Sequence, residues 1–110
     1  MSLKNATTTA LAASLVVTNE PANLFHLTLF NGNVGAQYLQ IHDSATLPAD
    51  TAVPVVVVKL AAGATYDADF GYRGRPFSNG ITVCNSSTGA TKTIGTTDCW
   101  ISATLERVAS

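Results

Sequence analysis

Residues 64–70, with the sequence ATYDADF, decide the fold class because apolar and polar side chains alternate along them. Side chains two positions apart lie on the same face of a β-strand. The apolar face of this segment would carry Ala64, Tyr66, Ala68 and Phe70. The opposite face would carry Thr65, Asp67 and Asp69. The pattern predicts a strand that is buried on one side only.

Seven further segments have the length and composition of strands, and turn sequences such as Asn31-Gly32 separate them. They are residues 14–18, 24–30, 37–42, 55–60, 81–85, 90–94 and 99–107. A short helix over residues 10–17 is the alternative for the first of them, although Val16 and Val17 favour a strand. Eight short strands at this spacing predict an all-β, antiparallel sandwich.

Charged residues are scarce. The chain has 6 Lys and Arg and 7 Asp and Glu, which is 12% of 110 residues, whereas about a quarter is usual. Because 46% of the residues are apolar, the surface must consist largely of Thr, Ser, Ala, Asn and Gly. Charge normally keeps folded monomers apart. The composition therefore predicts a surface that lies against other protein.

A length of 110 residues fits one domain. Residues 1–10 offer no apolar face and are predicted to form a flexible N-terminal arm, with the sandwich domain over residues 11–110. The net charge of -1 and the lack of a basic stripe argue against nucleic acid as a partner. No apolar run approaches the roughly 20 residues that cross a membrane. The N-terminal segment makes a poor signal peptide, which predicts synthesis in a cytoplasm.

Segments 24–30 and 37–42 are predicted to pair as a hairpin, with their leucine and isoleucine side chains facing the core. The other face would then carry two cross-strand pairs, Phe30 opposite Tyr38 and His26 opposite His42. Two histidines could bind a metal or sense pH, but no third ligand accompanies them. We therefore expect an ordinary surface or interface pair and no metal site.

Residues 55–58 are four consecutive valines, so neither face of their strand suits water. Such a strand is either central, with its second face covered from within the chain, or it lies at a subunit interface. In the last strand, Trp100 points away from the apolar row that contains Ile101 and Leu105. Trp100 is therefore a candidate interface anchor. Capping of one end of the core is the alternative role for this side chain.

Residues 71–80, GYRGRPFSNG, are predicted to form a Gly-rich loop with aromatic and cationic side chains, a composition common at protein interfaces. The alternative is a self-contained loop in which Arg73 or Arg75 pairs with Asp67 or Asp69. All candidate interface residues together are Phe30, Tyr38, Val56, Val58, Tyr72, Arg73, Arg75, Phe77 and Trp100.

Cys84 and Cys99 are the only cysteines. Alternation places Cys84 on the outer face of its strand and Cys99 on the inner face of its own. Because the chain is also expected to form in a cytoplasm, two free thiols are favoured over a disulfide. Neither cysteine has a second Cys or His close enough in sequence for the usual zinc pattern.

No set of residues has the spacing of a catalytic site. The chain lacks a G-x-S-x-G sequence and a phosphate-binding glycine loop. Asp67 and Asp69 share a face, as paired catalytic carboxylates would, but alternation on an exposed strand explains them more simply. We therefore predict that the protein is not an enzyme and uses no cofactor.

Two long runs, YLQIHDSATLPADTAVPVVVVKLAAGATYDADFG (38–71) and GRPFSNGITVCNSSTGATKTIGTTDCWISATLE (74–106), resemble small tailed-phage virion proteins of about this length. In that family a YLQ segment, an LP…AVP segment, a TKT segment and a late aromatic strand follow one another in this order. The resemblance covers residues 23–107, and its motifs are structural rather than catalytic.

The resemblance implies a jelly-roll-like sandwich that coats or cements a capsid, usually as trimers or other clusters. The implied partner is the major capsid protein or another virion protein, and the implied location is the virion, assembled in the host cytoplasm. The alternative is a tail, baseplate or fibre component. Such a component could be a receptor- or carbohydrate-binding module that uses Trp100, Tyr72 and Asp69.

Overall fold

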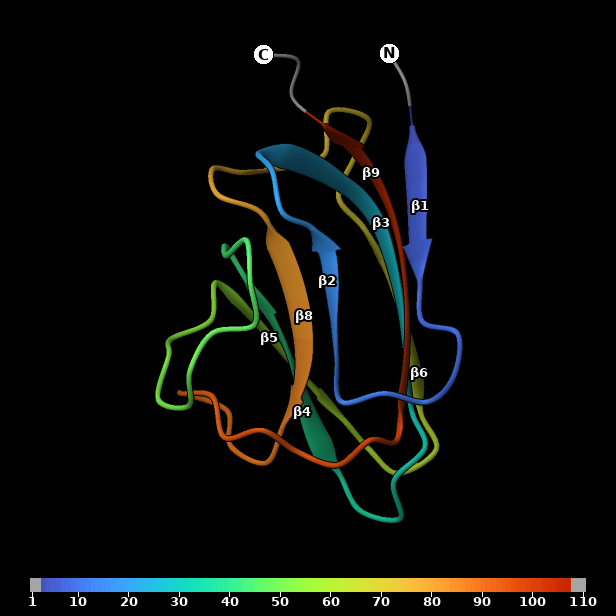
Figure 1. Cartoon of the computed structure of the whole chain (residues 1–110). Helices are drawn as coiled ribbons and strands as arrows, with labels where there is room; N and C mark the ends of the chain where they lie inside the picture. The colour runs from blue at the N-terminus through green and yellow to red at the C-terminus, as the bar shows by residue number, and fades with distance from the viewer. Residues whose placement is uncertain (1–2, 108–110) are drawn as a thin grey trace.

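The computed structural model describes residues 3–107, which form nine strands in two antiparallel sheets (Figure 1). Sheet A contains, in spatial order, β1 (Lys4–Thr7), β9 (Cys99–Arg107), β3 (Ala22–Asn31) and β6 (Thr65–Asp69), and β7 (Arg75–Phe77) also pairs with β3. Sheet B contains β2 (Ser14–Thr18), β8 (Ile81–Ser86), β4 (Gln37–His42) and β5 (Val56–Leu60). The described residues include no helix long and apolar enough to cross a membrane. The predicted all-β class is confirmed.

Strand pairing is nested along the chain. β4 pairs with β5, β3 with β6, β2 with β8, and β1 with β9. The chain therefore forms a long double ribbon that reverses direction between β4 and β5. This ribbon is wound so that β9 also pairs with β3, and β8 also pairs with β4, which completes the two sheets.

The buried apolar side chains of both sheets form a single core between the two layers. Sheet A contributes the fully buried Leu24, Leu27, Leu29, Ile101 and Leu105. Sheet B contributes Leu39, Ile41, Ile81 and Val83. Burying one such side chain contributes roughly 1.5–3 kcal/mol. The predicted core-facing side of segments 24–30 and 37–42 is thus correct, as is the inner face of residues 64–70, except that Tyr66 is largely exposed.

The predicted hairpin between segments 24–30 and 37–42 is wrong. β3 lies in sheet A between β9 and β6, whereas β4 lies in sheet B between β8 and β5. Alternation identifies which side chains of each strand face the core. It does not show whether two strands pair in one sheet or lie in facing sheets, because the same side chains face the core in both cases. His26 and His42 are consequently in different sheets and do not form a pair.

Three shorter segments also differ from prediction. Residues 4–7, expected in a flexible arm, form β1 along β9. Ala6 packs against the core while Lys4, Asn5 and Thr7 stay exposed, which suits an edge strand with one face in solvent. Residues 1 and 2 of that arm lie outside the described residues. Residues 75–77, expected in a loop, form β7. Residues 90–94 form no strand, and only Ile94 makes an isolated bridge, to Ser86.

Candidate interaction surface

The outer face of sheet A carries an aromatic pair, the half-buried Phe30 and the exposed Trp100. Phe30 on β3 lies directly opposite Trp100 on β9, and Thr65 on β6 lies on the other side of Phe30. The Trp100 side chain points away from the core and is 36% exposed. Phe30 was predicted to face Tyr38, but because β3 pairs with β9, its aromatic neighbour is Trp100. The structure thus brings together two of the predicted interface residues in an unforeseen combination.

Short polar side chains cover the rest of this face, and several are joined across strands by hydrogen bonds. The joined pairs are Thr28 with Asp67 (2.7 Å), Thr7 with Ser102 (3.0 Å) and Thr104 with Asn5 (3.0 Å). Each bond holds side chains from neighbouring strands in a fixed relation. A surface that is ordered in this way loses little side-chain freedom when another molecule binds to it.

Tyr72, Arg73 and Arg75 form a second exposed group, between β6 and the end of β7. Tyr72 is 84% exposed, and the Arg73 guanidinium lies 5.7 Å from the centre of its ring. Among the described residues, neither arginine forms an ion pair with Asp67 or Asp69. The alternative of a loop closed by such pairs is therefore not observed.

The other predicted interface residues lie inside the molecule or against its own loops. Phe77 is buried in the core, because β7 pairs with β3 and places Phe77 opposite the buried Ala22. Val56 and Val58 are half-buried against that core, whereas Val55 and Val57 are exposed by 46% and 42%. β5 is an edge strand, so the central-strand interpretation is wrong.

Tyr38 also has a partner within the chain. Its side chain lies on the outer face of sheet B, where the backbone of Gly89 approaches the ring closely. The Lys59 ammonium lies 5.8 Å from the ring centre. Tyr38 therefore supports the 87–98 segment and does not belong to the aromatic surface of sheet A.

No family model, curated protein or solved structure matches this chain. The carbohydrate-binding set considered above is not assembled either. Asp69 lies opposite His26, four residues along β3 from Phe30, the partner of Trp100, which separates the two positions by about 13 Å. The exposed surface with a compact aromatic centre is therefore the one around Phe30 and Trp100.

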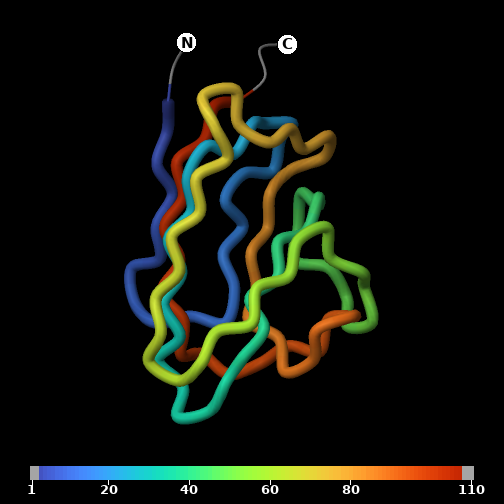
Figure 2. The backbone as a smooth tube through the Cα atoms, turned by 180° about the vertical axis from the view of Figure 1, so that it is seen from behind, coloured from blue at the N-terminus to red at the C-terminus, as the bar shows by residue number. Residues whose placement is uncertain are grey.

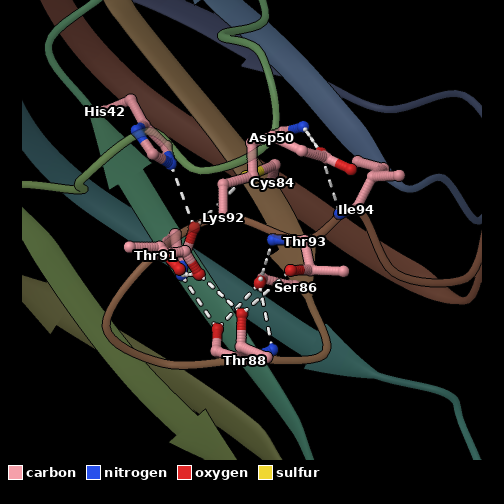
Figure 3. Close-up of polar contacts among 10 residues, drawn as sticks. His42, Asp50, Cys84, Ser86, Thr88, Thr91, Lys92, Thr93 and Ile94 are labelled. Atoms are coloured by element: carbon pink, nitrogen blue, oxygen red, sulfur yellow. Dashed lines mark hydrogen bonds and ion pairs between the residues drawn. The ribbon is translucent and has the colours of Figure 1, made fainter.

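The outer face of sheet B, in contrast, is covered by the two segments 43–55 and 87–98, and a polar cluster is buried beneath them (Figure 3). The Gln40 amide nitrogen donates to the carbonyl oxygens of Thr88, Gly89 and Thr91 at 3.0, 3.0 and 3.1 Å. The Gln40 amide oxygen accepts a hydrogen bond from His42 Nε2 at 3.0 Å. Gln40 thus fastens the second covering segment to the sheet.

Lys92 joins the two covering segments to each other. Its side chain is 3% exposed, and its Nζ lies 2.6 Å from Asp50 Oδ1. Its backbone N–H donates to the carbonyl of Ala52 at 2.8 Å, and its carbonyl accepts from the N–H of Thr51 at 2.7 Å. The hydrogen bond from Lys92, followed by that from the Ile94 N–H, lowers the pKa of Asp50, so this carboxylate is charged at neutral pH.

The cluster has the properties of a structural brace rather than a reactive site. Cys84, in the cluster, and Cys99, in the hydrophobic core, are both free and buried, which confirms the prediction of free thiols. Burial raises the pKa of each thiol to about 11, so both are protonated and unreactive near neutral pH. Residues 3–107 contain no group of three His, Cys, Asp or Glu side chains placed to hold a metal ion.

Sequence reasoning missed this cluster because alternation alone assigns Gln40, His42 and Cys84 to an outer, solvent-facing side. The available signal was the length of the two connections, 43–55 and 87–98. Connections of about a dozen residues without regular structure are uncommon unless they have a role, such as covering a surface.

Acidification from about pH 7 to pH 5 is expected to destabilise the protein through His42. Burial, and secondarily the charge of Lys92, lower the pKa of His42 from its ordinary value of 6.5. The unfolded chain therefore binds the proton first, and the free energy of unfolding falls as the pH drops below 6.5, by at most about 1.4 kcal/mol per pH unit for one proton. Urea unfolding at several pH values measures this slope. An equal slope in His42→Asn would contradict the assignment to His42.

Proposed function

We propose that this protein is a non-enzymatic structural component of a phage virion, a decoration or cement protein that binds the capsid shell through the outer face of sheet A. The observation that carries the proposal is the exposed Trp100 beside the half-buried Phe30, within a face of ordered, short polar side chains. Aromatic anchors surrounded by small polar groups are typical of the centres of protein interfaces.

The resemblance of residues 23–107 to small tailed-phage virion proteins supports this role. The nested strand pairing supports the jelly-roll form of the sandwich. If the short β7 is set aside, each sheet has four strands, and two such sheets wound from one double ribbon are the arrangement of a jelly roll. The scarcity of charge supports it too, because 13 charged residues in 110 give little protection against association.

The proposed partner is the major capsid protein or another virion protein, and on the capsid shell the protein acts as a homo-oligomer, with a trimer favoured. Assembly on the shell takes place in the host cytoplasm. Many copies on one symmetric shell make each contact sufficient at modest affinity, because attachment at several points raises the effective concentration of the next contact. Stabilisation of the shell then follows from the number of copies bound.

Replacing Trp100 with aspartate is expected to weaken binding to undecorated phage heads by about thirtyfold, the loss that follows from removal of an interface anchor worth about 2 kcal/mol. The side chain lies outside the core, so the variant retains its fold. Binding is measured by cosedimentation of purified protein with heads stripped of this chain.

The matched control is Val34→Asp, which adds the same charge at a fully exposed loop position. This variant should bind stripped heads like the wild type. Equal binding of Trp100→Asp and the wild type would refute the role of the sheet A face. Binding of the wild type to detached tails or to host glycans, without binding to heads, would support the tail alternative instead.

A further inference from the structure

The two sheets have four edges, formed by β1 and by β6 with β7 in sheet A, and by β2 and β5 in sheet B. An edge strand presents unpaired N–H and C=O groups that can pair with another chain. Proteins protect such edges with charges, with bulges or by keeping the strand short. The four edges of this molecule differ sharply in whether they carry these features.

Three of the edges are protected. β6 carries Asp67 and Asp69 on the same face, so pairing β6 with a second copy of itself would bring like charges together. β1 has only four residues and begins with Lys4. β2 has a register shift between Val16 and Thr18, which interrupts regular pairing along it.

β5 is the least protected of the four edges. Residues Val56–Leu60 pair in unbroken register with β4, and Lys59 is the single charged residue among them. Val57 is 42% exposed on the outer face, and Val56 and Val58 are half-buried against the core. Figure 2, which views the molecule from behind, shows β5 in yellow-green in front of β4 and β8.

The direction of the free backbone groups follows from the ladder. The N–H of Asn85 donates to the carbonyl of Ala13, the residue just before β2. Successive residues of a strand direct their backbone groups to opposite sides, so those of Cys84 point toward β4, where Cys84 pairs with Gln40. The backbone N–H and C=O of Gln40 therefore form hydrogen bonds with β8. Those of Leu39 form hydrogen bonds with β5, where Leu39 pairs with Val58. The backbone groups of Val57 and Lys59 consequently point away from β4.

We propose that β5 pairs antiparallel with β5 of a second copy of this chain, centred on Val58, and joins two B sheets into one continuous sheet. In this register Val57 and Lys59 of one copy exchange backbone hydrogen bonds with Lys59 and Val57 of the other. The two-fold contact is self-complementary, as a symmetric dimer requires. The surface differs from the sheet A face, so the inference does not depend on the virion role.

Charge and packing both fit this register. Each Lys59 lies opposite Val57 of the other copy, and no like charges face each other across the pair. On the inner face Val58 meets Val58 of the second copy, and Val56 meets Leu60, so the half-buried valines extend the existing core. The second copy thus covers apolar side chains that water touches in the monomer.

The test compares two substitutions of opposite charge at one exposed position. Val57→Lys places a lysine opposite Lys59 of the second copy twice per dimer, whereas Val57→Glu places a glutamate there twice. We expect sedimentation equilibrium to give a dimer for the wild type, about tenfold weaker association for Val57→Lys than for Val57→Glu, and recovery in the Val57→Lys, Lys59→Glu double variant.

Hydrogen exchange supplies a readout that does not require substitution. As the wild-type concentration rises, exchange of the Val57 and Lys59 amides should slow, while the amides of Val56 and Val58, which already pair with β4, should not change. A wild type that stays monomeric at millimolar concentration would overturn the proposal. Equal association of Val57→Lys and Val57→Glu, or loss of the dimer in Trp100→Asp alone, would also overturn it.

Discussion

Replacing Gln40 with methionine is expected to lower the free energy of unfolding by about 3 kcal/mol or more, because each buried polar group left without a partner costs about 1–3 kcal/mol. Methionine matches the size of glutamine but leaves the Gly89 carbonyl and His42 Nε2 without a partner. The Thr88 and Thr91 carbonyls lose Gln40 but still accept from Ser86 Oγ and Thr88 Oγ1. Urea unfolding gives the change in free energy. Amide exchange within 87–98 should also become faster, because Gln40 fastens that segment to the sheet.

Gln37→Met is the matched control on the same strand. The Gln37 amide oxygen is buried without a hydrogen-bond partner among the described residues, so its removal relieves an unmet polar group. The control should therefore be neutral or slightly stabilising. If both variants lost the same stability, the Gly89 carbonyl and His42 would have to be satisfied by something other than Gln40.

Alternation in the sequence predicted the individual strands better than their partners. Residues 64–70 were recognised because water and core impose opposite demands on the two faces of β6. The same reasoning correctly placed Trp100 outside and Cys99 inside. It could not distinguish a β3–β4 hairpin from two strands in facing sheets, because Leu29 and Leu39 face the core in either arrangement.

Side chains whose environment depends on distant segments were predicted less well. Phe77 looked like an exposed loop residue because no local pattern shows that β7 pairs with β3. The two faces of β5 could not be told apart because four valines in a row have no alternation, and the structure turns Val56 and Val58 toward the core and leaves Val55 and Val57 exposed. Gln40 looked exposed because its cover comes from residues about fifty positions later in the chain.

Gly80→Ala is expected to lower the free energy of unfolding by about 2–4 kcal/mol, through forced overpacking. A Cβ at Gly80 would lie 2.7 Å from the Thr18 carbonyl oxygen, 2.8 Å from the Ala45 Cα and 2.9 Å from the Ser44 carbonyl oxygen. All three are backbone atoms and cannot rotate away. The end of β2 and the start of the first covering segment would both have to move.

The same substitution at Gly35 separates this crowding from the general effect of losing a glycine. A Cβ there meets only the Asn33 side chain, at 3.6 Å, which is an ordinary contact. Gly35→Ala should change the free energy of unfolding by less than about 1 kcal/mol, and a thermal melt would place it well above Gly80→Ala. If the two variants had the same melting temperature, the 43–55 segment would have to be free to move away from β8. Ser44, which accepts a hydrogen bond from Thr82, would then not hold that cover in place. A lower melting temperature for Gly80→Ala alone would mean that the cover over the polar cluster depends on this one close backbone approach.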